Sequence, residues 1–394
     1  MLALIFAPFY ILINGYLLFW VLRWTGACHR LCASGGFRAV LCVLYAFTAL
    51  TPLTGFLIRK PLAVHRLLKR IGNDWLGWMA YLVLAVLTVE LLLFLVRRIR
   101  GKDFAQMQRV RRIQGGAALA MVCAVSVYGT VHAFSPRVAE YEVSVPGKGE
   151  DMSIALLSDL HLGYNTDPSY IEQMAQMVNG MQVDLVAVAG DIFDNEYEAI
   201  PEPERVAAAL ASMESTDGTY ACWGNHDVAE AILAGFTWDT QDRRKDDPRF
   251  RRFLAASDMT LLEDEMTVLD NGVQLIGRLD PSRDRKLGEK RLTPAEWARR
   301  IDPEQPVFVL DHQPKELEAL SAAGVDLDLS GHTHDGQIFP ANWIMPLLWE
   351  NPHGCVQVGE MESVVTAGWG VWGPAMRVGT DSEIVHITVH FTEK

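Results

Sequence analysis

The stretch Gly331-His332-Thr333-His334-Asp335-Gly336-Gln337 decides how the second half of the chain is organised. It directly follows the apolar run 325–330, which is typical of a strand that ends in a loop. Histidine is the commonest neutral metal ligand in proteins. Two imidazoles one residue apart favour binding of two neighbouring ions over binding of a single ion. The stretch therefore predicts a metal centre at the end of a strand.

Four more clusters of ligand-type residues lie upstream, each just after a predicted strand. The strands are predicted at 154–157, 185–189, 220–223 and 307–310, where short apolar runs are bounded by turn residues. Together with the two histidines above, the candidate metal ligands are Asp159, His161, Asp191, Asn225, His312, His332 and His334. A single aspartate in such a place fits a helix cap equally well, and residues 225–227 alone fit a turn. Seven such residues at five strand ends favour a metal site.

The donor set indicates the ion and the chemistry. Mixed nitrogen and oxygen donors fit Mn, Fe or Zn, and the absence of Cys argues against a structural zinc site. Asp159 and His161 face the same way and can share one ion, whereas the carboxylate of Asp191 can bridge two. Two divalent ions about 3.5–4 Å apart clamp a phosphoryl group and activate a water.

Two residues of the third cluster are predicted to act in catalysis rather than as ligands. His226 is expected to stabilise charge on the phosphoryl group or to protonate the leaving oxygen, with Asp227 holding its ring. Asp194 and Asp335 are expected next to the ligands.

The order D-x-H, G-D-x-x-D, G-N-H-D, H, G-H-x-H resembles the calcineurin-like metallophosphoesterase family. The resemblance covers roughly residues 150–390 and all five motif blocks of that family in order. The segments 331–337 and 372–379 look like its membrane-anchored branch, which has N-terminal transmembrane helices. Asp335 stands where that branch commonly has glycine.

The resemblance implies both a fold and a set of roles. The alternating strand and helix patterns by themselves indicate an α/β domain. The family implies an αββα sandwich, in which two β-sheets pack together and helices cover both outer faces. It also implies that Asp159, His161, Asp191 and His334 hold the first ion. The second would be held by Asp191, Asn225, His312 and His332.

The N-terminal part predicts a membrane region. Four apolar runs, at about 2–22, 39–58, 75–96 and 117–134, approach or reach the roughly 20 residues needed to cross a bilayer. We therefore expect a transmembrane region of four helices at 1–136, a linker with an entry strand at 137–150, and the metallophosphoesterase domain at 151–394. Glu90, inside the third run, is interpreted as a helix-packing or interfacial residue rather than a functional carboxylate.

Charge divides the chain in the same place. Residues 1–140 contain 16 Lys and Arg against 4 Asp and Glu, and residues 141–394 contain 19 against 44. So acidic a domain is a poor binder of nucleic acid. Ten basic residues flank the spans on one side of the membrane and six on the other, which places the C-terminal domain outside the cytoplasm.

The sequence therefore predicts a multi-pass cell-membrane hydrolase that binds two divalent metal ions. It would cleave a phosphoester or pyrophosphate bond through a metal-activated water. The stretch 343–349 is unusually apolar, and it fits either the core or a surface that meets membrane lipids and an amphiphilic, lipid-linked substrate. The alternative is a membrane sensor or scaffold whose metal domain binds a phosphorylated ligand without turnover.

Overall fold

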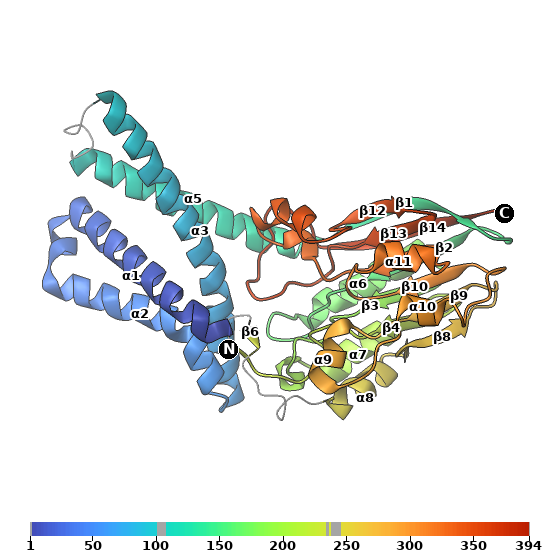
Figure 1. Cartoon of the computed structure of the whole chain (residues 1–394). Coiled ribbons are helices and arrows are strands. Elements are labelled where there is room, and N and C mark those ends of the chain that lie inside the picture. Colours follow the sequence, from blue (N-terminus) through green and yellow to red (C-terminus); the bar gives the residue numbers. More distant parts are fainter. Residues whose placement is uncertain (1, 101–107, 234–235, 238–245, 394) are drawn as a thin grey trace. The chain divides into compact units, whose positions relative to one another are not determined.

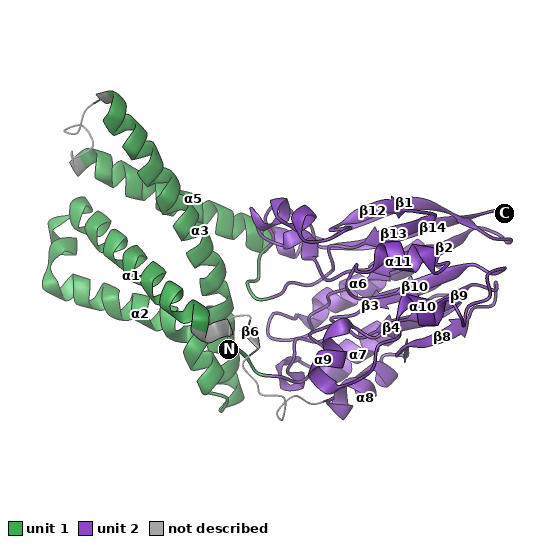
Figure 2. Cartoon of the chain, in the orientation of Figure 1, with its two compact units in different colours: residues 1–131, 231–238, 373–376 green, residues 132–230, 239–372, 377–394 purple. Residues whose placement is uncertain are grey.

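A computed structural model describes residues 2–100, 108–233, 236–237 and 246–393. Lys102, one of the basic residues behind the predicted orientation, lies outside these ranges. The chain divides into two compact units, coloured separately in Figure 2. The first contains residues 1–131 with the short segments 231–238 and 373–376, and the second contains 132–230, 239–372 and 377–394.

The first unit is helical. Its long helices are α1 (Leu2–Cys28), α2 (Gly35–Leu57), α3 (Leu62–Arg100) and α5 (Gln108–Ala133), with a short 3-10 helix η1 (Arg30–Ala33) between the first two. All four long helices are long and apolar enough to cross a membrane. The predicted N-terminal region of four apolar helices is confirmed. The two-stranded ribbon of β5 (Ile232–Leu233) and β6 (Phe236–Thr237) also belongs to this unit.

The third helix is much longer than its apolar run predicted. It begins at Leu62 instead of near position 75, so basic residues that were expected in a loop lie in its first turns. Pro61 precedes it, and the following Leu, Ala, Lys and Arg residues are strong helix formers. Gly72 allows close packing on α2, since a Cβ there would lie 3.0 Å from the nitrogen of Pro52.

Polar side chains join the first three helices. The Tyr10 hydroxyl on α1 donates to the carbonyl oxygen of Ala49 on α2 at 2.6 Å, and Trp75 Nε1 on α3 donates to the Tyr10 hydroxyl at 3.0 Å. Tyr45 on α2 donates to Asn14 Oδ1 on α1 at 3.1 Å. Such hydrogen bonds supply part of the helix association that apolar burial cannot supply in lipid.

The second unit contains two six-stranded sheets, as Figure 1 shows. The order of the first is β1 (Arg137–Pro146), β14 (Glu383–Thr392), β2 (Met152–Leu157), β3 (Leu185–Ala189), β4 (Thr219–Cys222) and β7 (Met259–Leu261). The order of the second is β12 (Gly354–Val358), β13 (Met361–Val365), β11 (Leu327–Ser330), β10 (Val307–Leu310), β9 (Gln274–Gly277) and β8 (Glu265–Val268). Strands β2, β3, β4 and β7 run parallel, and so do β9, β10, β11 and β13.

Side-chain alternation along these strands explains the layers. On β2, Ile154 and Leu156 pack in a core shared with Phe308 and Leu329 of the second sheet. Their neighbours on the same strand, such as Leu157, pack instead in a core with helix residues. A strand buried on both faces reads as a continuous apolar run, which is why these strands were predictable.

Helices cover the outer face of each sheet. The helices α6 (Pro168–Met181), α7 (Pro203–Ala211) and α8 (Pro248–Ala256) supply residues to the outer core of the first sheet. On the second sheet, the outer core contains residues of α10 (Pro294–Trp297) and α11 (Leu317–Ala322). The predicted αββα sandwich is confirmed.

Two strands and one α-helix of the domain were not predicted from the sequence. Strands β8 and β12 are edge strands with half-exposed residues, so they lack the apolar run of a central strand. The short helix α9 (Pro281–Leu287) is mostly polar, and it begins at Asp280, whose side chain accepts from the backbone N–H of Ser282.

A buried carboxylate at the start of β14 connects several segments. Glu383 accepts hydrogen bonds from His353 Nε2 at 2.8 Å, from the backbone N–H of Ala367 at 2.9 Å and from Arg137 at 3.2 Å. Burial alone would raise the pKa of Glu383, but the bond and charge of His353, the N–H of Ala367 and the charge of Arg137 together lower it to about 2. Burial alone would lower the pKa of His353, but its bond to Glu383 and the charges of Glu383 and Asp335 together raise it.

We predict that Glu383→Gln destabilises the protein most between about pH 4.5 and 6.5. Below that window the stabilisation from Glu383 is lost as pH falls toward the lowered pKa, and above it the contribution of His353 is lost as pH rises through its raised pKa. The loss of a hydrogen bond to a charged group should cost roughly 1.5–3 kcal/mol. Thermal unfolding across this pH range measures it, with the exposed Glu360→Gln as control. Parallel pH profiles for the two variants would contradict the assignment.

Candidate metal centre

Five strand ends meet at one edge of the sandwich. The loops after β2, β3 and β4 of the first sheet carry Asp159, His161, Asp191 and Asn225, and those after β10 and β11 of the second carry His312, His332 and His334. Chemistry in α/β proteins collects at the carboxyl ends of parallel strands because the loops there converge. The structure thus brings all seven predicted ligands into the same region of the domain.

One group consists of Asp159, His161 and His334, all of which are buried. His334 Nε2 lies 3.2 Å from Asp159 Oδ1 and 3.0 Å from His161 Nε2. One ligand atom from each of the three residues lies within 4.8 Å of the others, so the group could hold a metal ion.

A second group consists of Asp191, His312 and His332, with the same spacing of ligand atoms. His312 Nε2 lies 3.1 Å from Asp191 Oδ2, 3.1 Å from Asn225 Oδ1 and 3.0 Å from His332 Nδ1. Asp191 Oδ2 also lies 3.9 Å from His161 Nε2 of the first group. The carboxylate of Asp191 therefore stands between the two groups.

The donor atoms fit cations. The Nδ1 of His312 lies 2.8 Å from the carbonyl oxygen of Ala189 and must donate to it, so in the neutral ring the lone pair is on Nε2. That lone pair faces two further oxygen acceptors, on Asp191 and Asn225. Asp159 Oδ1 is buried with no hydrogen-bond donor among the described residues. Acceptors that converge in a buried space need positive charge between them.

The pKa shifts of the candidate ligands reflect their burial and the charges beside them. Burial alone would raise the pKa of Asp191, but the nearby His312 and His226 hold it well below its usual range. Burial lowers the pKa of His161, and the neighbouring imidazole of His334 lowers it further. Burial also lowers the pKa of His332, to about 3. At His312 the carboxylates of Asp191 and Asp159 outweigh burial and raise the pKa, so metal binding there would release a proton. The lowered carboxylate pKa of Asp191 and the neutral imidazoles of His161 and His332 are protonation states that ligate metals.

The backbone at the ligands is strained. Asp159, His161, Asp191, His332 and His334 all have positive φ, between 44° and 71°. Left-handed backbone is uncommon for residues with a side chain, and it concentrates at functional sites where the surrounding structure enforces it. The turns direct the side chains of successive motif residues toward the same region.

Glycines allow the strand ends to approach this closely. A Cβ on Gly224 would lie 2.2 Å from the backbone nitrogen of Asp191, and one on Gly331 would lie 2.0 Å from Ser158 Oγ. The glycine before Asn225 and the glycine before His332 are therefore required by close packing.

His226 lies beside the ligands, but its predicted partner was wrong. Its Nδ1 lies 2.6 Å from Asn195 Oδ1, and its ring centroid is 5.2 Å from that of His161. Asp227 is fully buried and accepts hydrogen bonds from the backbone N–H groups of Gly224 at 2.7 Å and Phe193 at 2.8 Å. Residues 225–228 form a turn in which Asp227 holds the loop backbone, while Asn195 holds the His226 ring.

Two more supporting residues were missed from the sequence. Ser158 Oγ donates to Asp159 Oδ2 at 2.7 Å. Arg377 is fully buried, its Nη1 donates to the carbonyl oxygen of His334 at 3.3 Å, and its Nη2 lies 3.3 Å from His334 Nδ1. Ser158 could have been noticed as the neighbour of a ligand, whereas Arg377 and Asn195 reach the site only through the fold.

The remaining predicted neighbours differ in their placement. Asp194 Oδ1 lies 4.0 Å from His161 Nδ1, close to a ligand as expected. The backbone N–H of Asp335 donates to Thr333 Oγ1, and its carboxylate interacts electrostatically with His353 and Glu383.

Known proteins share this arrangement of motifs. Residues 152–336 match the family model described as calcineurin-like phosphoesterase. A metallophosphoesterase of Helicobacter pylori (strain J99) is 30% identical over 255 residues, which cover 64% of this chain and 63% of the relative. A transmembrane protein with metallophosphoesterase domain from Danio rerio is 30% identical over 289 residues, which cover 69% of this chain and 62% of the relative.

A third relative carries a more specific name. UDP-2,3-diacylglucosamine pyrophosphatase LpxG of Chlamydia trachomatis is 22% identical over 220 residues, which cover 48% of this chain and 64% of the relative. The chain spans less than two thirds of the length of each of these three relatives. The motif order, the two groups of ligand-type residues, the sandwich fold and the matched family model agree, and the chain contains a calcineurin-like phosphoesterase domain at residues 152–336.

Proposed function

We propose that the protein is a membrane-anchored dimetal hydrolase that cleaves a phosphoester or pyrophosphate bond of a lipid-linked substrate. The position of Asp191 carries the proposal, because its Oδ2 lies 3.1 Å from His312 Nε2 and 3.9 Å from His161 Nε2. A carboxylate shared between two groups of ligands is the arrangement that a pair of ions needs.

The residues divide between the ions as the family resemblance implied. Asp159, His161 and His334 would hold the first ion and Asn225, His312 and His332 the second, with Asp191 on both. Two bound divalent cations would stabilise the phosphoryl oxygens and lower the pKa of water to provide the nucleophile. Ser158, Arg377 and the carbonyl oxygen of Ala189 hold the ligands in place, so that little reorganisation accompanies binding.

His226 would act on the substrate rather than on the metals. Asn195 Oδ1 can only accept, so Nδ1 of His226 carries the proton and Nε2 is the ring atom left for the substrate. The ring is only half-buried, with the ring of Trp372 5.7 Å away. This geometry supports a role in stabilising the phosphoryl charge or in protonating the leaving oxygen.

A lipid-linked substrate is supported by the apolar stretch after the metal loop. Its side chains are exposed rather than in the core: Trp343 is 71%, Leu347 82% and Leu348 64% accessible. The next residue in the stretch, Trp349, has its ring 4.8 Å from that of His332. Exposed apolar groups that continue to a ligand suit a substrate with a phosphate at one end and acyl chains at the other.

The competing proposal is a membrane sensor that binds a phosphorylated ligand without turnover. Both proposals require the ligand set, but only hydrolysis requires His226 beside it. Turnover by the metal-loaded full chain separates them. The substrates should include chromogenic phosphomonoesters and phosphodiesters, a pyrophosphate-linked lipid and a lipid phosphate.

We predict that Asp191→Asn loses metal from both groups together with turnover. An amide cannot supply the bridging negative charge, and metal affinity and activity should each fall by more than about 100-fold. Elemental analysis and hydrolysis assays measure the two effects. The exposed Asp270→Asn is the control and should retain both. Two bound ions and normal turnover in Asp191→Asn would disprove the dimetal centre, and metal binding without turnover in the wild type would favour the sensor.

His226→Ala should keep both metals and lose roughly 10²–10⁴-fold in kcat, because a group that works in the transition state contributes about that factor. If it protonates the leaving oxygen, the loss shrinks for a nitrophenol leaving group, which needs no proton. An equal loss on good and poor leaving groups indicates charge stabilisation. Asn195→Ala, which frees the ring, should show a smaller loss with the same leaving-group pattern. Normal kcat on every substrate would remove His226 from the mechanism.

The excess of basic residues on one side of the membrane supports an extracytoplasmic C-terminal domain. We predict that protease added to intact cells, or to protoplasts where a wall blocks access, cleaves this domain. The cytoplasmic side should remain protected, which an epitope inserted after Ser34, between α1 and α2, can report. A domain that is cleaved only after the membrane is permeabilised would reverse the orientation.

A further inference from the structure

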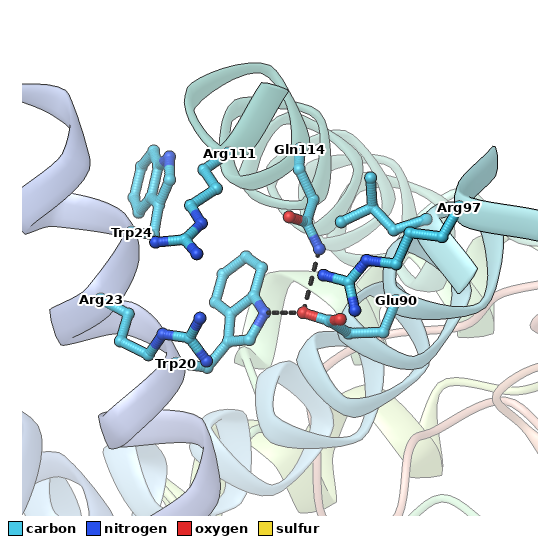
Figure 3. A pocket seen from close by; sticks show the side chains of 8 residues that line it. Trp20, Arg23, Trp24, Glu90, Arg97, Arg111 and Gln114 are labelled. Carbon is cyan, nitrogen blue, oxygen red and sulfur yellow. Dashed lines mark hydrogen bonds between the residues drawn. The ribbon is translucent and has the colours of Figure 1, made fainter. Parts of the chain in front are cut away.

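A polar cavity lies among three helices of the helical unit, and none of its lining residues is a candidate metal ligand. Figure 3 shows its lining, which comes from α1, α3 and α5. On α3 and α5 the lining residues are three, four or seven positions apart and so share one face, and on α1 Trp20 is three and four positions from Arg23 and Trp24. They are Trp20, Arg23, Trp24, Glu90, Leu93, Arg97, Arg111 and Gln114. The cavity volume is about 190 Å³, against the 10–15 Å³ or so that one water needs.

The centre of the lining is a satisfied carboxylate. Glu90 Oε1 accepts hydrogen bonds from Trp20 Nε1 at 3.0 Å and from Gln114 Nε2 at 3.0 Å, so one oxygen connects α1, α3 and α5. This supports the interpretation of Glu90 as a helix-packing residue. Glu90 therefore has a structural role in the lining, where it fixes the side chains of its donors Trp20 and Gln114.

Three guanidinium groups surround this centre. In Figure 3 the side chains of Arg23, Arg97 and Arg111 extend toward the same space from three different helices. Within the part of the chain that the structure describes, none of the three forms an ion pair; Arg23 lies 5.4 Å over the ring of Phe19. Three positive charges face one carboxylate that already has two donors, so the cavity has an excess of positive charge.

The position along the helices places the cavity near a membrane surface. Trp24 is four residues before the end of α1, Arg97 three before the end of α3, and Arg111 three after the start of α5. Tryptophan and arginine at helix ends are typical of the headgroup level of a bilayer. Arg23, Arg97 and Arg111 are among the ten basic residues on the side predicted to be cytoplasmic.

We propose that this cavity binds a phosphate group at the membrane surface. Arginine forks match phosphate oxygens bidentately, and basic pockets between transmembrane helices bind lipid headgroups. The stacked rings of Trp20 and Trp24, with centroids 6.5 Å apart, supply an apolar wall beside the charges. An anionic phospholipid headgroup and a free phosphate share this chemistry. The proposal does not depend on hydrolysis at the metal centre.

The test uses the full chain in detergent and counts bound phosphatidylglycerol and phosphatidylcholine by native mass spectrometry, with inorganic phosphate as competitor. The double variant Arg97→Gln/Arg111→Gln removes two of the guanidinium groups. Arg98→Gln/Arg109→Gln makes the same change of charge at the same helix ends without touching the cavity lining, and it is the matched control. Arg23→Gln gives an independent single change on α1, and thermal unfolding shows that each variant is folded.

We expect phosphatidylglycerol to bind in preference to phosphatidylcholine and the lining variant to lose at least about 10-fold in affinity, since each charge-assisted bond to phosphate is strong. The control should lose little. Competition by millimolar inorganic phosphate would identify free phosphate as sufficient, and no competition would identify the lipid. An equal loss in lining and control variants, or no anion preference in the wild type, would overturn the site.

Discussion

Face-to-face packing of the two β-sheets is the interaction on which the metal centre depends. The apolar side chains of β2 and β3 share one core with those of β10 and β11. Because the central strands within each sheet are parallel, their carboxyl ends lie at the same edge of the sandwich. Asp191 from one sheet and His312 from the other therefore approach within 3.1 Å. Neither sheet alone contains a complete group of ligands.

The energetics of the site require that support. Five of the seven predicted ligands have left-handed backbone, at a cost of roughly 1–3 kcal/mol each. Their sum is comparable with the whole net stability of an ordinary domain, about 5–15 kcal/mol. The buried carboxylates and imidazoles add a desolvation cost of their own. A large core, with full burial of an aliphatic side chain contributing about 1.5–3 kcal/mol, is what keeps this arrangement folded.

The helical unit also contains buried polar groups, but different interactions hold its elements together. In lipid, apolar burial does not hold helices together, so close contacts at Gly72 and hydrogen bonds such as Tyr10 to Ala49 do so. Glu90 belongs to this set because two donors satisfy one of its oxygens. The arginines around it are not satisfied in this way, and this difference separates a packing contact from a binding site.

The sequence by itself determined the residue types and the order of the candidate ligands, the central strands and the four apolar helices. These features are local, because an apolar run followed by Asp or His can be recognised from neighbouring residues in the sequence alone. Edge strands β8 and β12 and the early start of α3 could not be predicted from apolar patterning. The two strands form because they pair with a neighbouring strand, and the first turns of α3 form because of helix propensity. Only the tertiary structure decided that Asn195 rather than Asp227 holds His226, and that Arg377 supports His334 from 43 positions away. Hydrogen bonds between distant residues depend on where the fold directs each side chain, and spacing along the chain does not contain that direction.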